Sequence, residues 1–306
     1  MEIFKFLIYF YMILALASLA LGFYRLFFGR KFRFERALSL AFFTAFAVHA
    51  LNLALRAYIS GHAPWSDAYE SLVYISLISV LAGVLFFKHQ SFALGAASLF
   101  ASVSLFVAHL NFINPQITNL VPVLKSFWLS VHVSVITASY GFLGFGFVLG
   151  LVGLILMALK NDKNEQKLSE QIRYLAATDE LSLIIGLSLL TIGNFLGGVW
   201  ANESWGRYWG WDSKESWSYI TIIVYAIVLH LRFIPKLRGV FAFLTASVLS
   251  FASVLFTYFG VNFYLSGLHS YANGESFGVS GLIYLILAAL ALLIALAYRG
   301  RDIKVV

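Results

Sequence analysis

Nine long apolar segments divide this chain of 306 residues, and they constrain its fold more than any other feature. A helix crosses the hydrocarbon core of a bilayer with about 20 mostly apolar residues. Because 61% of the residues are hydrophobic and only 11% are charged, a water-soluble domain is excluded. The predicted spans are residues 3–24, 38–55, 71–87, 92–109, 128–159, 181–200, 217–231, 240–259 and 279–298.

The predicted fold is an all-α polytopic integral membrane protein, with residues 1–306 as a single transmembrane domain and with helical outer loops. About nine transmembrane helices are expected, and eight are possible because the span 217–231 is short. The span 128–159 would extend roughly 48 Å as a straight helix, so it must tilt or project from the membrane. The polar stretch 160–180 predicts a cytoplasmic helical extension or linker.

Lysine and arginine predict the orientation of the chain. If the N-terminus lies outside, 16 of the 21 basic residues fall on the inner side, while the 14 acidic residues divide equally. Since inner loops carry an excess of basic residues, the N-terminus is expected outside and the C-terminus inside. The first span has no basic region before it and no small-residue cleavage site, which predicts a retained helix rather than a signal peptide.

Three further properties exclude whole classes of function. The net charge of +7 comes from short loops between apolar spans, so it indicates topology and not nucleic-acid binding. The chain has no cysteine, which excludes a disulfide scaffold, a thiolate metal site and a cysteine nucleophile. It also shows no nucleotide-binding loop.

The outer segment 201–217 has the most unusual composition, because five of the seven tryptophans lie within or next to it. Trp205 and Trp209 are four residues apart and would share one face of a helical turn. Gly206 and Gly210 would let the backbone bend and a flat ligand approach closely. An interfacial aromatic belt is the alternative, but the concentration of aromatic and charged residues favours a binding surface for a large planar ligand.

Histidines accompany this segment. Two lie within predicted spans, where ionisable side chains are costly and usually functional. For each histidine near the outer side, a hydrogen-bonded structural role is the alternative to ligand binding. The positions are His49 and His230 in spans, His62, His109, His132 and His269 near the outer side, and His89 in an inner loop. A planar ligand with acidic arms and an iron that takes axial imidazoles is haem, and these residue types suit it.

Several motifs resemble a known family. Residues 205–217 (WGRYWGWDSKESW) resemble the tryptophan-rich WWD motif of the haem-handling superfamily. Residues 61–70 (GHAPWSDAYE), 120–132 (LVPVLKSFWLSVH) and 267–271 (GLHSY) resemble the CcsA (ResC) family of System II cytochrome c-type biogenesis proteins. The resemblance covers most of the chain, about residues 49–271.

This resemblance implies haem transport and delivery to apocytochrome c at the outer face of a bacterial cytoplasmic (inner) membrane. The chain would be a subunit of the holocytochrome c synthase (cytochrome c haem-lyase), promoting thioether attachment of haem to Cys-x-x-Cys-His. Enzyme activity would belong to a membrane protein complex with CcsB (ResB). Haem b would be the transported substrate, and no nucleic acid would be a partner.

The resemblance also implies roles for individual histidines. His132 and His269 look like the outer pair that ligates the haem iron. His230 looks like the membrane ligand, with the second ligand expected from the partner chain. His49 is the alternative partner of His230, ranked second because the two lie at different predicted depths.

The expected cofactor-binding residues are Trp205, Arg207, Tyr208, Trp209, Trp211, Asp212, Lys214 and Trp217, with Arg56 and Lys125 as further cations for the propionates. Asp212 and Glu215 would fix the loop through ion pairs or orient a ligand histidine. Ser213 stands where the family commonly has proline, which predicts a looser turn.

Two other functions stay open at this stage. The chain could be a secondary transporter or flippase for another amphipathic ligand. Absence of bound haem together with a different copurifying ligand would favour this function. It could also be a non-catalytic assembly subunit whose outer loops only dock a partner. Loop variants that lose partner binding but handle haem normally would favour this function. Nine spans without an inverted repeat argue against the transporter.

Overall fold

The computed structural model describes residues 2–29, 34–86, 91–110, 113–117, 119–120, 125–267 and 281–302. Within these ranges the chain is helical and contains no β-strand. The α-helices are α1 (Glu2–Phe28), α2 (Glu35–Ser60), α3 (Ala68–Leu85), α4 (Ser91–Ala108), α5 (Phe127–Ala158), α6 (Glu165–Trp205), α7 (Ser213–His230), α8 (Val240–Leu255), α9 (Val261–Tyr264) and α10 (Gly281–Ala297).

The prediction of nine membrane-spanning helices is confirmed for the described residues. Nine helical segments there are long and apolar enough to cross a membrane. The short seventh span is extended, because a 3-10 turn continues α7 to give Ser213–Phe233. A π-helical turn, Phe256–Gly260, joins α8 to α9 in one span, Val240–Tyr264. The predicted helical extension of the sixth span is also confirmed, since α6 has 41 residues and begins at Glu165.

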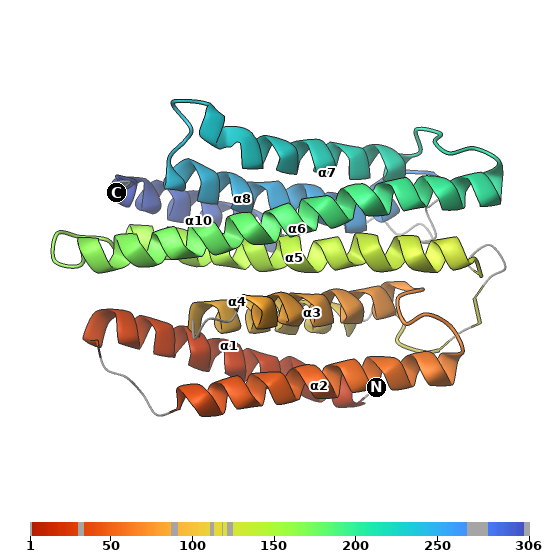
Figure 1. Cartoon of the computed structure of the whole chain (residues 1–306), viewed down its shortest axis with the longest axis horizontal. Coiled ribbons are helices and arrows are strands. Elements are labelled where there is room, and N and C mark those ends of the chain that lie inside the picture. The colour runs from red at the N-terminus through yellow and green to blue at the C-terminus, as the bar shows by residue number, and fades with distance from the viewer. Residues whose placement is uncertain are drawn as a thin grey trace.

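Helix α5 occupies the centre of the bundle, and α6 runs beside it over much of its length (Figure 1). One edge of the bundle is formed by α1 and α2, which pack on α3 and α4. The opposite edge is formed by α7 and α8. The C-terminal ends of α2 and α6 and the N-terminal ends of α3, α5 and α7 therefore meet at one end of the bundle, here termed the tryptophan end.

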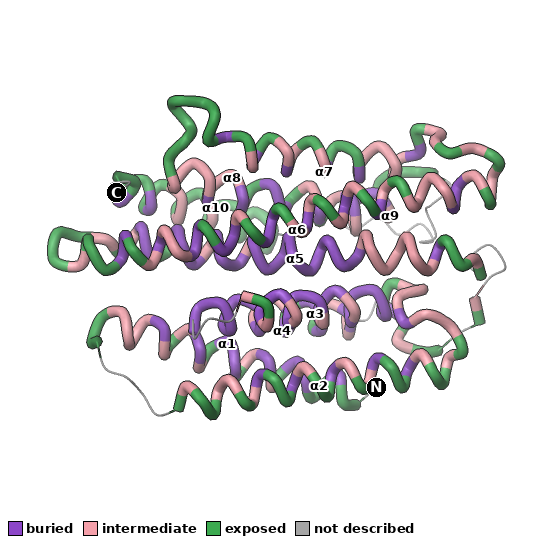
Figure 2. The backbone as a smooth tube through the Cα atoms, viewed as in Figure 1, coloured by how far each residue is buried: buried purple, intermediate pink, exposed green. Residues whose placement is uncertain are grey.

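Small residues on α5 let its neighbours approach closely. A Cβ at Gly144 would overlap the ring of Phe100 on α4, and one at Gly150 would lie 2.8 Å from Val248 on α8. Close van der Waals packing of this kind associates helices in lipid, where no hydrophobic driving force acts between them. Figure 2 shows the result, with α5 mostly buried and the outward faces of α2 and α10 exposed. Exposed leucine and phenylalanine on such faces are what a lipid-facing surface requires.

Candidate functional site

The tryptophan-rich segment is mostly helical. Helix α6 continues through Trp205, and α7 begins at Ser213, so only residues 206–212 are irregular; these seven residues are termed the tryptophan loop. Gly206 ends α6 with a left-handed φ of 70°, and its N–H donates to the Asn202 carbonyl over 2.9 Å. This αL cap satisfies one of the last helical carbonyls and turns the chain sharply.

Two carboxylates shape the other end of the tryptophan loop. Asp212 and Glu215 form a capping box at the N-terminus of α7. The Glu215 Oε2 accepts hydrogen bonds from the backbone N–H of Gly210 at 2.8 Å and of Asp212 at 3.2 Å. These carboxylates therefore fix the loop through its own backbone.

The loop is tied to the end of the eighth span. Ser213 donates its hydroxyl to the Ser266 carbonyl at 2.7 Å, and the Lys214 ammonium donates to the Asn262 side chain at 2.8 Å. Ser213 occupies the first helical position of α7, where proline is also favoured. The Ser213 hydroxyl thus supplies a tertiary bond that a proline there could not make. The charged end of Lys214 is directed at Asn262.

The aromatic side chains divide into two groups. In the first, the ring of His132 lies parallel to Trp200, with 6.4 Å between centroids and 8° between planes. Trp205 packs edge-on against Trp200, with centroids 4.8 Å apart. Trp200 is 1% exposed, so this group forms a rigid wall of α5 and α6. The sequence alone did not assign Trp200 to the site. Trp200 lies five residues before Trp205, so both belong to the last turns of one helix.

The second aromatic group lies on the tryptophan loop. Trp209 packs perpendicular to Trp211 at a centroid distance of 5.6 Å and edge-on to Tyr219 at 6.4 Å. Trp211 is 72% exposed and has a φ of 58°, a left-handed conformation that bulky residues rarely adopt. Tyr208 is also exposed. An exposed tryptophan held in a strained backbone is typical of a functional position.

Trp217 belongs to neither group, because its ring packs on Phe256 of the π-helical turn with centroids 4.1 Å apart.

His132 is held in a defined orientation. Its Nδ1 lies 2.7 Å from the Gly193 carbonyl of α6 and donates to it, because that oxygen can only accept. A Cβ at Gly197 would lie 2.6 Å from the His132 ring, so this glycine makes room for the imidazole. In the neutral ring the lone pair then resides on Nε2. A metal-ligating histidine is commonly oriented by such a carbonyl.

The cations expected to bind the propionates lie in three different environments. Arg207 folds over Gly210, where an added Cβ would overlap the guanidinium, so Arg207 and not a ligand lies against this glycine. Lys125 is exposed in the segment before α5. Arg56 lies elsewhere, in a buried network between α2 and α3.

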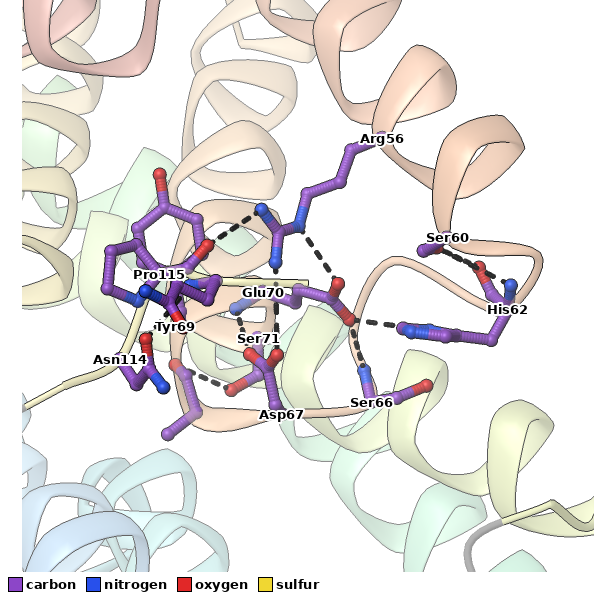
Figure 3. A network of polar contacts seen from close by, with 12 residues as sticks. Arg56, Ser60, His62, Ser66, Asp67, Tyr69, Glu70, Ser71, Asn114 and Pro115 are labelled. Carbon is purple, nitrogen blue, oxygen red and sulfur yellow. Dashed lines mark hydrogen bonds and ion pairs between the residues drawn. The ribbon is translucent and has the colours of Figure 1, made fainter. Parts of the chain in front are cut away.

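Figure 3 shows that network. Arg56 is 6% exposed and donates to Glu70 at 2.9 Å and to the Pro115 carbonyl at 3.1 Å. Asp67 caps α3 by accepting from the Glu70 N–H at 2.7 Å, and burial raises the pKa of Asp67 above its ordinary value. His62 lies 3.7 Å from the second oxygen of Glu70. The guanidinium of Arg56 is thus already used in neutralising buried carboxylates.

This network, which the sequence did not predict, is connected to the histidine side of the site. Trp65, in the same turn, donates its indole N–H to the Ser130 carbonyl at 2.9 Å, in the first turn of α5. Tyr258 of the π-helical turn bonds to the Ser71 hydroxyl at 2.6 Å. The turn after α2 therefore helps to position the end of α5 that carries His132.

The two histidines within spans lie on opposite edges of the bundle. His49 on α2 is fully buried, with Nδ1 3.4 Å from the Tyr11 hydroxyl and with Phe4 edge-on to its ring. His230 at the end of α7 is exposed and donates from Nδ1 to the Ala226 carbonyl at 2.7 Å. Figure 1 places α2 and α7 far apart, so the structure does not bring these two histidines together. His269 lies outside the described residues.

Comparisons with known proteins agree with one another. Residues 65–269 match the family described as Cytochrome C assembly protein. The chain is 54% identical over 277 residues to protein NrfI of Wolinella succinogenes, covering 90% of this chain and 31% of that protein. It is 35% identical over 260 residues to the cytochrome c biogenesis protein CcsA of Prochlorococcus marinus, covering 76% and 82%. The chain thus spans about a third of NrfI but most of CcsA.

A solved structure shows the same fold. The cytochrome c haem lyase CcmF superposes with a TM-score of 0.56 over 98% of this chain and 50% of that chain, at 18% sequence identity.

Proposed function

The chain belongs to the cytochrome c assembly protein family, and on that premise we propose that it carries haem to the outer face of the membrane for attachment to apocytochrome c. The proposed membrane is a bacterial cytoplasmic membrane with the tryptophan end outside. The proposed substrate is haem b. The proposed partner is a CcsB (ResB) subunit, with which the chain would form a System II holocytochrome c synthase.

The orientation of His132 is the observation that carries this proposal. Its Nδ1 is engaged by the Gly193 carbonyl, so Nε2 is the nitrogen with the lone pair that an iron requires. The bond to Gly193 and the close approach of Gly197 hold the ring in this orientation, with the Trp200 indole parallel to it. We assign His132 as one axial ligand of the outer haem and His269 as the other.

The tryptophan loop supplies the proposed contact surface. The exposed rings of Tyr208 and Trp211, with Trp209 behind them, offer apolar faces to a porphyrin. Arg207 and Lys125 are assigned to the propionates, since Arg56 is paired with Glu70 and Lys214 with Asn262. Trp205 acts through Trp200 and Trp217 supports the base of α7.

Haem uptake from the inner side is assigned to His230. The imidazole is exposed on the bundle surface, and its Nδ1 bond to Ala226 again leaves the lone pair on Nε2. His49 is buried at the opposite edge of the bundle and cannot face His230. The second ligand at this position is therefore proposed to come from the partner subunit.

The attachment step needs no thiol from this chain, which has no cysteine. Each thioether forms when a substrate S–H adds across a haem vinyl C=C, so a C–S and a C–H bond form and no net oxidation occurs. The proposed contribution of this chain is to hold the iron and to orient the vinyl edge towards the substrate thiols.

Absorption spectra of the complex purified in detergent, as isolated and after dithionite reduction, test the proposal. We expect low-spin haem bands that weaken in His132→Gly and His230→Gly and that added imidazole restores. His109→Gly is the matched control, because His109 directly follows α4 and also donates from Nδ1 to a backbone carbonyl, that of Leu105 at 2.8 Å, while its Nε2 faces the Tyr69 hydroxyl at 3.3 Å. A colourless wild-type complex that takes up no added haem would overturn the proposal in favour of a transporter for another ligand.

A further inference from the structure

Asp179 on α6 is a carboxyl group that the proposed haem function does not use. Its side chain is 0% exposed, and no hydrogen bond of ordinary geometry reaches either carboxyl oxygen, although the Ser247 hydroxyl lies beside them. Among the ion pairs of the described residues, none involves Asp179. An ionisable group buried in a helix bundle without a countercharge is costly and marks a candidate functional site.

The surroundings of Asp179 come from three other helices. On α5, a Cβ at Gly146 would lie 2.6 Å from Oδ1, so this glycine opens the space that the carboxyl fills. Ser247 of α8 and Tyr225 of α7 lie beside it. Neither hydroxyl makes a hydrogen bond of ordinary geometry, although Ser250 lies beside Tyr225. Four poorly satisfied polar atoms therefore gather in one buried position, an arrangement that requires an explanation in any native structure.

Charge makes the neutral acid the favourable form at this position. A charged neighbour along the chain is Glu180, whose carboxylate is paired with Arg232 at 2.8 Å. A second negative charge next to it, removed from water and without a cation of its own, would be strongly disfavoured. A protonated Asp179 carries no charge and gains an O–H that can donate to Ser247 or Tyr225.

A pocket of about 230 Å³ lies directly towards the inner end of the bundle from this cluster. Its lining includes Ala176, Val228 and Phe243. These residues are three before Asp179, three after Tyr225 and four before Ser247, which is one helical turn, about 5.4 Å, on each of α6, α7 and α8. Glu180 and the three arginines Arg173, Arg232 and Arg238 add polar groups to the lining, and such groups attract water.

We propose that Asp179, with Ser247 and Tyr225, is a proton-binding site within the bundle that exchanges its proton with the inner side through this pocket. The site takes up and releases a proton on one carboxyl oxygen, and no other atom is transferred. Its three residues lie outside the tryptophan loop, and none is within two residues of a proposed iron ligand, although the pocket lining includes Val228, two residues before His230.

Infrared difference spectroscopy of the full-length protein tests the protonation. A neutral carboxylic acid has a C=O stretch above the amide bands, and we expect this band at neutral pH in the wild type and its loss in Asp179→Asn. Asp162→Asn, in the exposed turn after α5, is the matched control and should retain the band. An unchanged band in Asp179→Asn would overturn the proposal.

The test does not depend on the folding of the variant. Wild-type protein labelled with 13C at the aspartate carboxyl should show the band shifted to lower frequency, and an unshifted band would contradict an aspartic acid as its source. Loss of the band on adding sodium ions in place of potassium would show that the site binds a metal cation, which also overturns the proposal.

The route through the pocket has its own measurement. After transfer to D2O, the band shifts as the proton is replaced by deuterium. Ala176→Leu fills the pocket one turn from the carboxyl, so we expect a slower shift with the same final band. A rate equal to that of the wild type would exclude this pocket as the path.

Discussion

Trp211 shows how backbone strain and function meet at a single residue. Its left-handed φ of 58° costs an L-residue roughly 1–2 kcal/mol, while glycine there costs about 0.5–1 kcal/mol in chain entropy. We therefore expect Trp211→Gly to unfold at the same or a slightly higher temperature while its haem bands weaken. Trp211→Ala is the comparison, since it removes the ring and keeps the strain. A large loss of thermal stability in Trp211→Gly would show that the exposed ring is structural.

Arg56 and Glu70 form the buried ion pair of the tryptophan end, and the two should be strongly coupled. Removing one partner leaves a buried charge uncompensated, which typically costs about 3–5 kcal/mol. Arg56→Met is therefore expected to lower the unfolding temperature greatly. The double variant Arg56→Met with Glu70→Met should recover part of that loss in a double-mutant cycle. Additive effects of the two changes would mean that the pair does not interact in the folded protein.

At the scale of elements, the capping box at the start of α7 holds the tryptophan loop. Glu215→Ala removes the acceptor of two backbone N–H groups, and the expected loss is about 1–2 kcal/mol. Because Glu215 holds the loop and contacts no ligand, its removal should broaden or shift the haem bands at temperatures where the protein is still folded. Glu203→Ala, at the end of α6, is the control for removing a carboxylate at the tryptophan end. Equal spectra for both variants would contradict a loop-fixing role.

The turn from α6 into α7 also shows what the sequence could and could not predict. Apolar length predicted every span, and the helical extension before the sixth followed from its mixed charges. Residues 201–217 read as a loop, because tryptophan, glycine and charge obscure the helical ends at Trp205 and Ser213. The partners of Arg56 and the hydrogen bond from Trp65 to Ser130 could not be predicted, since they join residues whose proximity only the packing of α2, α3 and α5 decides.

For the whole molecule, orientation in the membrane is the property that most of the proposed function assumes. The chain has no cysteine, so Ile117→Cys and Asp162→Cys each introduce a single label at opposite ends of the bundle. In intact cells, an impermeant maleimide should label Ile117→Cys, and it should label Asp162→Cys only after permeabilisation. The reverse pattern would place the tryptophan end inside and would exclude delivery of haem to the outer face.

The length of α6 has a practical consequence for imaging this protein. Its 41 residues extend about 62 Å, twice the roughly 30 Å of hydrocarbon, without a break from the turn at residues 160–164 to Trp205. An antibody fragment bound to this turn would be a rigid fiducial at the end of the bundle opposite the tryptophan end. Because one continuous helix joins that turn to Trp205, the orientation of the fragment in electron micrographs would report the orientation of α6 up to the start of the tryptophan loop.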